Sequence, residues 1–330
     1  MRILFYLLTP LLLFSNIQNF DSKIFVAGHN GLVGKAIVST LKEQGYTNII
    51  TRSSKELDLR DAQKTKAFFE EEKPEFVYLA AAKVGGIWAN KLYCADFIYD
   101  NLAIELNVID ASYRSGVKKL LFLGSSCIYP RLCPQPIKEE YLLSGYLEPT
   151  NSSYAVAKIA GIEMCQAYRR QHGFNAICLM PTNLYGPNDN FDLENSHVLP
   201  ALIRKFIEAK ENNVESVQMW GTGSALREFL YVEDLAEASL FLMNHYNDAE
   251  IVNVGTGKDI SILDLAYIIK EETGYEGTIT LDPSKPDGTP RKLLTIEKLA
   301  ALGFEPKTSL RDGIRKTINW YKDNEKAKIQ

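Results

Sequence analysis

The residues best suited to chemistry are concentrated in one span of the chain. Ser125, Ser126 and Cys127 place two hydroxyls and a thiol in a row, and Tyr154 and Lys158 follow shortly after them. Tyr154 and Lys158 are four residues apart in a segment rich in Ala, Ile and Met, so on a helix they share a face one turn apart. A lysine in that place can influence the pKa of the tyrosine phenol.

This set of side chains predicts a proton-transfer site. An unperturbed phenol has a pKa near 10, so bringing Tyr154 close to neutrality requires about three pH units, or about 4 kcal/mol, from positive charge and hydrogen bonding. The Lys158 ammonium and a cationic cofactor ring are expected to supply it. Ser125 or Ser126, after the apolar run 119–123, would share a carbonyl oxygen with Tyr154. The alternative is an exposed helical Tyr-x-x-x-Lys pair without chemistry.

A strand, a glycine-rich loop and a helix precede this span and are expected to bind a dinucleotide. The apolar run 24–27 predicts a short strand, and the helix that follows is expected to end near Gln44, before Gly45. The glycine spacing G-x-x-G-x-x-G suits a tight turn that brings the backbone close to a pyrophosphate at a helix N-terminus. The alternative is a glycine-rich turn without a ligand. The loop residues are Gly28, His29, Asn30, Gly31, Leu32, Val33 and Gly34.

The end of the second predicted strand indicates which dinucleotide is bound. A carboxylate normally accepts the ribose hydroxyls of NAD at this place, whereas the chain has Arg52 followed by two serines. A guanidinium suits a 2′-phosphate, so the sequence favours NADP(H) over NAD, the alternative being a solvated surface arginine. Asp58 and Leu59 are placed to cradle the adenine.

Further alternation of strands and helices predicts the fold class. Apolar runs at 76–79, 120–123 and 176–180 alternate with helical segments, including one at about 95–115 that Gly116 closes. We expect an α/β protein with a Rossmann-type doubly wound parallel sheet, in which ligands bind at the carboxyl ends of the strands. Residues at or just after such ends are Leu123, Gly124, Pro181, Thr182, Asn183 and Leu184.

The pattern changes after residue 187, so we expect two parts. Residues 22–187 would form the Rossmann domain and residues 188–330 a smaller C-terminal substrate lobe, interleaved with segments such as 251–254 that return to the sheet. A helix is predicted at about 197–211, and residues 285–291 are too rich in turn formers for an element. Residues 1–21 form an apolar extension of uncertain status that we leave out of the fold.

Composition excludes several classes of function. The 330 residues are 46% hydrophobic and 24% charged with a net charge of −4, which is ordinary for a soluble globular protein and lacks the basic footprint of a nucleic-acid binder. The five cysteines show neither metal-ligand spacing nor an even disulfide framework, which favours a reduced, cytoplasmic protein without a bound metal.

The N-terminal apolar run leaves a minor alternative for location. Residues 3–14 are too few to span a bilayer and resemble the apolar part of a signal peptide, although no convincing cleavage site follows. A start placed upstream of the true one is the other interpretation. No stable membrane span is expected, and secretion or membrane association stays the minor alternative.

Several longer sequence segments resemble those of a known protein family. The glycine-rich loop, Ser125 and Tyr154-x-x-x-Lys158 resemble the extended short-chain dehydrogenase/reductases. Within them the chain is similar, from about residue 23 to 322, to epimerase/reductases of GDP-4-keto-6-deoxy-mannose. It departs from some members at Asn30 and Lys205, where they carry arginine. The shared strings are 80–87, 123–130, 181–187, 195–198 and 285–292.

The resemblance implies a bifunctional enzyme that epimerises carbons 3 and 5 and then reduces the ketone at carbon 4 with NADPH. Cys127 and His197 would be the acid/base pair, and Tyr154 with Ser125 would hold the oxyanion before Tyr154 protonates it. A homodimer through a helical face is also implied. Cofactor contacts are implied for the loop 28–34, Arg52, residues 123–126, Lys158, residues 181–184 and His197, and GDP contacts for Lys205, Trp220, Arg227 and Asp287.

Each of these roles has a competing structural interpretation. Cys127 could be a small buried hydrophobe or pair with Cys133, and His197 could simply lie near a helix start. Trp220 and Arg227 could be ordinary core and surface residues. At the level of function, the alternatives are a UDP-hexose 4-epimerase that retains its NAD and a non-catalytic dinucleotide-sensing protein.

Overall fold

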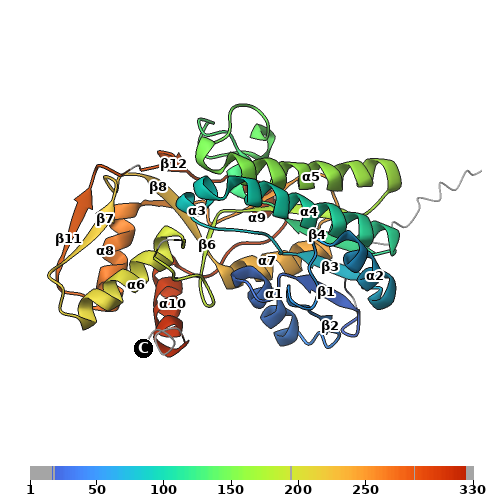
Figure 1. Ribbon diagram of the computed structural model, residues 1–330, viewed down its shortest axis with the longest axis horizontal. Coiled ribbons are helices and arrows are strands. Elements are labelled where there is room, and N and C mark those ends of the chain that lie inside the picture. The colour runs from blue at the N-terminus through green and yellow to red at the C-terminus, as the bar shows by residue number, and fades with distance from the viewer. Residues whose placement is uncertain (1–16, 18, 194, 286, 325–330) are drawn as a thin grey trace, which may run out of the picture.

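A six-stranded parallel sheet lies at the centre of the larger part of the molecule (Figure 1). The structure is a computed structural model that describes residues 17, 19–193, 195–285 and 287–324. The strand order is β2-β1-β3-β4-β5-β9, so the chain reverses its direction across the sheet between β1 and β3, where ligands bind in such folds. The strands are β1 (Ile24–Ala27), β2 (Ile49–Ile50), β3 (Phe76–Leu79), β4 (Lys119–Leu123), β5 (Ala176–Pro181) and β9 (Val252–Val254).

Helices cover both faces of this sheet, which is why its strands are apolar without alternation. Ile24 and Val26 of β1 pack with one set of helices, while Phe25 and Ala27 pack with the other. The first face carries α1 (Leu32–Glu43) and α7 (Val232–His245), and the second carries α2 (Ala62–Glu72), α4 (Cys94–Arg114) and α5 (Ser152–His172).

The remaining part forms a separate lobe with its own apolar core, at the left of Figure 1. Strand β8 (Leu226–Tyr231) is central to it, because it pairs with β6 (Asn183–Tyr185), β10 (Asp259–Ser261) and β12 (Arg291–Lys292). Strands β7 (Ser216–Trp220) and β11 (Thr278–Asp282) pair with each other. The lobe's helices are α6 (Val198–Glu211), α8 (Ile262–Thr273) and α10 (Leu310–Asn324).

Short elements connect these layers. A brief helix, α3 (Ile87–Leu92), precedes α4, and α9 (Glu297–Ala301) packs beside β9. Three 3₁₀ turns lie between β4 and α5, where the chemically capable residues are concentrated. They are η1 (Ser126–Ile128), η2 (Glu139–Tyr141) and η3 (Pro149–Asn151).

The expected Rossmann-type sheet is confirmed, and two sequence-based expectations are wrong. Residues 285–291 were expected to form no element, but Arg291 begins β12, which gains its hydrogen bonds from β8 rather than from local propensity. The extension 1–21 was left out of the fold, yet Ile17 is buried in the core and its amide N–H donates to the Asn244 side chain. The apolar run 3–14 lies outside the described residues.

Among the described residues, no helix combines the length and the apolar character needed to cross a membrane.

Candidate active site

Ser125 and Cys127 follow the carboxyl end of β4. Ser125 is the N-cap of the turn η1, and its hydroxyl oxygen accepts the Cys127 amide N–H at 3.2 Å. A serine at this place satisfies a backbone donor that the short turn leaves free. The cap therefore fixes the direction in which the Cys127 side chain leaves the backbone.

Tyr154 and Lys158 lie one turn apart on α5, as their spacing predicts. The Lys158 Nζ lies 5.8 Å from the centre of the Tyr154 ring, and the Ser125 side chain lies near enough to the Tyr154 phenol to lower its pKa. The ring also packs edge-on against Phe97 of α4, with 6.4 Å between ring centres. Ser125, Tyr154 and Lys158 therefore form one cluster.

A buried carboxylate pairs with this lysine. Glu105 of α4 lies 3.0 Å from the Lys158 Nζ, and both side chains are 2% exposed. Space for Glu105 exists because residue 161 is glycine: a Cβ there would lie 2.7 Å from the Glu105 Oε2 and 2.5 Å from the Phe122 ring. Burial raises the pKa of Glu105, while the Lys158 ammonium opposes that rise.

The protein surroundings of Tyr154 act against the expected shift of its phenol pKa towards neutrality. Burial, followed by the negative charges of Cys127 and Glu105, raises the pKa of Tyr154 above its ordinary value, and the hydrogen bond with Ser125 opposes the rise only in part. Burial, ahead of these two charges, therefore favours the protonated phenol. A protonated phenol is the form that can donate a proton to an alkoxide.

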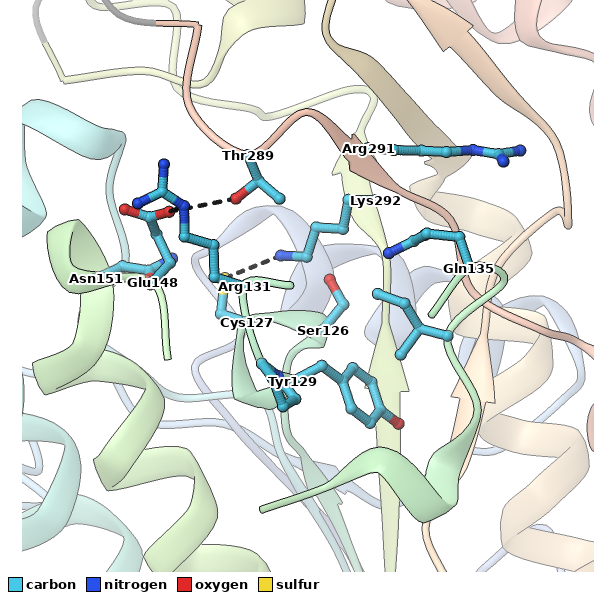
Figure 2. Close-up of a pocket in the computed structure, with 12 residues that line it drawn as sticks. Ser126, Cys127, Tyr129, Arg131, Gln135, Glu148, Asn151, Thr289, Arg291 and Lys292 are labelled. Carbon is cyan, nitrogen blue, oxygen red and sulfur yellow. Dashed lines mark hydrogen bonds and ion pairs between the residues drawn. The ribbon is translucent and has the colours of Figure 1, made fainter. Parts of the chain in front are cut away.

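Cys127 is a free, partly accessible thiol beside an ammonium that the sequence-based interpretation did not include. The Lys292 Nζ lies 3.4 Å from the Cys127 Sγ (Figure 2). Burial by itself raises the pKa of the thiol, but Lys292 and hydrogen bonds from Ser125 and Asn151 outweigh it and hold that pKa below its ordinary value. The suggested pairing with Cys133 is wrong, since both thiols are free.

His197 is the N-cap residue of α6, and its side chain makes no capping hydrogen bond. Part of the His197 residue is exposed to solvent, but many protein atoms surround its imidazole and remove water from it. This desolvation, together with the Lys292 ammonium, lowers the pKa of the imidazole. Lys292 thus acts electrostatically on both members of the expected acid/base pair.

The glycine-rich loop fits a dinucleotide pyrophosphate. Gly28 has a φ of +86°, and a Cβ there would lie 2.8 Å from the backbone of Ala81. A Cβ at Gly34 would overlap the Gly28 carbonyl, so the turn and the helix pack too closely for any side chain at either place. The N-cap Gly31 provides no side-chain cap, which leaves the first N–H groups of α1 to a ligand.

Arg52 lies after β2 as expected, but its guanidinium has an internal partner. Its Nη2 donates to the Glu72 Oε1 at 2.6 Å, and the group lies over the Phe68 ring. The partly exposed Arg52 must exchange or share Glu72 to bind a 2′-phosphate. Asp58, expected near the adenine, is held by Arg60, which forms a salt bridge with it at 2.8 Å.

The other expected cofactor residues lie at the carboxyl edge of the sheet. The Gly124 N–H donates to the Leu179 carbonyl, which brings residues 123–126 beside residues 181–184. The Thr182 hydroxyl and the Asn183 amide both donate to the Glu228 carbonyl, so these two side chains join β8 to the sheet.

The four residues expected to contact GDP lie in the lobe. Trp220 is exposed, with the ammonium groups of Lys205 and Lys285 within 6.0 and 5.5 Å of its ring centre. The Asp287 carboxylate accepts the Thr222 N–H and hydroxyl, and its backbone carbonyl accepts from Arg227 at 3.4 Å. Trp220 is therefore not a core residue, contrary to the alternative interpretation. The Asp287 carboxylate stabilises the turn that contains Thr222.

Sequence reasoning missed Lys292 and Glu105. Lys292 ends the shared string 285–292, and its position in that string was the available signal. Glu105 lies on the buried side of α4 with Asn101, Val108 and Ser112, at helical spacing, so a charged residue on an otherwise buried face was the other signal.

A parallel Rossmann-type sheet, a glycine-rich loop and a Ser-Tyr-Lys cluster at the strand ends define the chain as an extended short-chain dehydrogenase/reductase. Residues 24–255 match the NAD dependent epimerase/dehydratase family. The chain belongs to this family.

The relatives are nucleotide-sugar enzymes that the chain matches over nearly its full length. It is 60% identical to GDP-L-fucose synthase 1 of Arabidopsis thaliana, over 94% of this chain and 96% of the relative. It is 49% identical to GDP-L-fucose synthase of Escherichia coli (strain K12), over 92% and 97% of the two chains. A crystal structure of a GDP-L-fucose synthetase from Naegleria fowleri bound to NADP superposes with a TM-score of 0.87 at 32% identity, covering 93% of this chain and 95% of that one.

Proposed function

We propose that this protein converts GDP-4-keto-6-deoxy-D-mannose to GDP-L-fucose by epimerising carbons 3 and 5 and reducing the ketone at carbon 4 with NADPH. The observation that carries the proposal is that the Cys127 thiol and the Ser125–Tyr154 pair adjoin one another at the end of β4. One site thereby combines a base with a proton donor. The chain is 49–60% identical to two GDP-L-fucose synthases over more than nine-tenths of its length, which supports the same activity.

Epimerisation requires a base, an acid and a stabilised oxyanion. The ketone acidifies the protons on carbons 3 and 5. When the Cys127 thiolate takes one of them, an S–H bond forms and the C–H bond breaks. The C–H electron pair forms a double bond to carbon 4, and the π pair of the carbonyl moves to its oxygen. Ser125 and Tyr154 donate hydrogen bonds to that oxygen. His197 returns a proton to the other face of the carbon, and its lowered pKa makes its protonated form a stronger acid.

Reduction uses the same oxygen-binding groups. When bound beside the substrate, NADPH would supply the hydride that carbon 4 accepts. Tyr154 gives its proton to the oxygen that becomes the hydroxyl, and its raised pKa means that this proton is present at neutral pH. The loop 28–34 with the N-terminus of α1 would bind the pyrophosphate, and Arg52 the 2′-phosphate. Residues 22–187 would thus bind the cofactor and much of residues 188–330 the GDP moiety.

The test is a product analysis in deuterium oxide. Purified protein with GDP-4-keto-6-deoxy-mannose and NADPH is expected to release GDP-L-fucose and NADP in equal amounts, with deuterium at carbons 3 and 5 by NMR. Turnover of UDP-glucose or UDP-galactose, with none of the GDP-ketosugar, would instead assign a UDP-hexose epimerase. Reduction without deuterium incorporation would assign a simple 4-reductase.

Arg52 should set the preference between the two dinucleotides. Arg52→Ala is expected to weaken NADPH use about 10- to 150-fold, because a charge-assisted contact contributes about 1.5–3 kcal/mol, while NADH use changes little. Steady-state kcat/KM with each cofactor measures this. Glu72→Gln serves as the matched control, because it releases Arg52 from its ion pair and should preserve or improve NADPH use. Equal losses with both cofactors in Arg52→Ala would show that Arg52 does not bind that phosphate.

A homodimer is proposed through the outer face of α4 and α5. Tyr99, Leu102 and Leu106 of α4 and Val156 of α5 are exposed apolar side chains on the two helices that pack against each other. Apolar side chains gathered on neighbouring helices favour burial against a second copy. Analytical sedimentation of the purified protein at micromolar concentration tests this proposal. A mass equal to that of one chain would refute the homodimer.

A cytoplasmic location stays a proposal as well. All five cysteines are described and free, which suits a reducing compartment. Fractionation of cells that express the tagged protein would test it.

A further inference from the structure

The contact between Cys127 and Lys292 joins two segments that are 165 residues apart. Cys127 follows β4 of the central sheet, whereas Lys292 ends β12 of the lobe, where it lies opposite Arg227 of β8. The Lys292 Nζ points towards the sulfur across the pocket in Figure 2. This ammonium is therefore brought to the thiol by the packing of the lobe on the sheet domain.

Lys292 is held in place by the backbone on both sides of it. On one side, the Leu226 N–H donates to the Pro290 carbonyl, as β12 runs beside β8. On the other, the Leu293 N–H donates to the Gln135 side chain at 2.9 Å, and the Leu294 N–H donates to the buried Glu228 carboxylate at 3.0 Å. The lysine therefore extends from a segment fixed at three points, which limits where its ammonium can reach.

Other charged groups lie near the thiol, but among the described residues Lys292 is the cation with a hydrogen-bond contact to the sulfur. Burial lowers the pKa of Arg227 of β8, while the sulfur's negative charge favours its cationic form. The thiol likewise acts on Tyr154 of α5. The charged residues that line the pocket are Arg131, Glu148, Arg291 and Lys292. Among them, Arg131 pairs with Glu148 at 3.1 Å and Arg291 with Asp259 at 2.5 Å, so both arginines have carboxylate partners.

We propose that Lys292 is a positioning residue that holds Cys127 as a thiolate, ready to act as the base of epimerisation. The proposal rests on the proposed function and adds to it the source of the base. A free thiol is only a few per cent thiolate at pH 7, whereas an opposite charge within about 4–6 Å shifts a pKa by about 1–3 units. An ammonium at 3.4 Å raises the thiolate fraction above that of an unpaired thiol in the same position. Because the two groups come from different lobes, the base forms only when β12 is docked.

The test titrates the thiol without substrate. The rate of Cys127 alkylation by iodoacetamide is followed between pH 5.5 and 10 by mass spectrometry of the Cys127 peptide, with exposed Cys94 in the same protein as internal reference. In the wild-type protein the apparent pKa of Cys127 is expected to lie below that of Cys94. A Cys127 pKa equal to or above that of Cys94 would overturn the proposal without any variant.

Variants then assign the effect to Lys292. Lys292→Met is expected to raise the apparent pKa of Cys127 by about one unit or more and to slow its alkylation at pH 7 at least tenfold. Lys292→Arg should keep a near wild-type value, since it retains the charge. Lys307→Met removes one charge at an exposed site elsewhere and should change nothing. A wild-type titration in Lys292→Met would refute the role of this lysine.

A second readout links the thiol to the chemistry. In Lys292→Met, deuterium exchange at the substrate carbons should fall at pH 7 and recover as the pH is raised, because hydroxide then generates the thiolate that the lysine no longer favours. If Lys292→Met unfolds, buried Cys165 and Cys178 become alkylated, and the wild-type comparison and Lys292→Arg decide the question. A depressed Cys127 pKa without formation of GDP-L-fucose would overturn the proposed function but not the lysine–thiolate contact.

Discussion

Tyr154→Phe is expected to depress reduction of the ketone by about 10²–10⁴-fold, the usual contribution of a positioned general acid. The reason is that the phenol is the proton donor beside Ser125, and phenylalanine leaves the new alkoxide without it. The ring contact with Phe97 does not involve the hydroxyl, so the variant should fold normally. NADPH oxidation followed at 340 nm measures the effect.

The same variant should retain part of the carbon exchange, because Cys127 and His197 are unchanged. Tyr146→Phe is a suitable control, since Tyr146 is 97% exposed and lies outside the Ser-Tyr-Lys cluster. The raised pKa of Tyr154 sets the pH dependence as well: the phenol keeps its proton through neutral pH, so wild-type reduction should not decline there from loss of that proton. Parallel losses of exchange and reduction would show that one oxyanion contact limits both steps.

Cys127→Ser should separate the two reactions in the opposite sense. A serine hydroxyl is a far weaker acid than a thiol, and an ammonium at the distance of Lys292 cannot ionise it near neutrality. Deuterium incorporation at one or both of carbons 3 and 5 is therefore expected to be abolished. Hydride transfer does not require the thiol, so slow reduction of the unepimerised ketone should yield a 6-deoxyhexose of the wrong configuration, identifiable by NMR.

Cys133→Ser provides the matched control for that experiment. Cys133 lies in the same connection between β4 and α5, but burial raises the pKa of its thiol, so it is mostly protonated. Its replacement should leave exchange and reduction near wild-type rates. Wild-type exchange in Cys127→Ser would remove the thiol from the mechanism and restore its interpretation as a small packed side chain.

Local signals predicted the sheet domain well because each signal reports on neighbouring residues. The helix expected to end near Gln44 is α1, Leu32–Glu43, and the helix expected at about 95–115 is α4, Cys94–Arg114. Apolar period, capping residues and a closing glycine specify such elements within a few residues of chain. The lobe was less predictable, since β12 has two residues and exists only through its pairing with β8.

Charge pairing was the part of the site that sequence could not supply. Arg52 was correctly placed after β2, but its partner Glu72 is twenty residues away on α2. The spacing of Tyr154 and Lys158 suggested that the lysine lowers the tyrosine's pKa, whereas burial and the charges of Cys127 and Glu105, which come from other elements, act in the opposite direction. A pKa depends on every charge within several ångströms and on burial, and neither quantity is local in sequence.

By itself, the sequence determined the parallel sheet, the glycine-rich loop and the identities of the groups that can transfer protons, because these depend on residue type and on spacing along one element. Only the tertiary structure decided the protonation states of those groups. Packing of α4 on α5 pairs Glu105 with Lys158, and burial of the Tyr154 phenol favours its protonated form. Docking of β12 brings Lys292 to Cys127 and favours the thiolate. The Coulomb energy that sets these states falls with distance in space, and that distance is fixed by the fold rather than by separation along the chain.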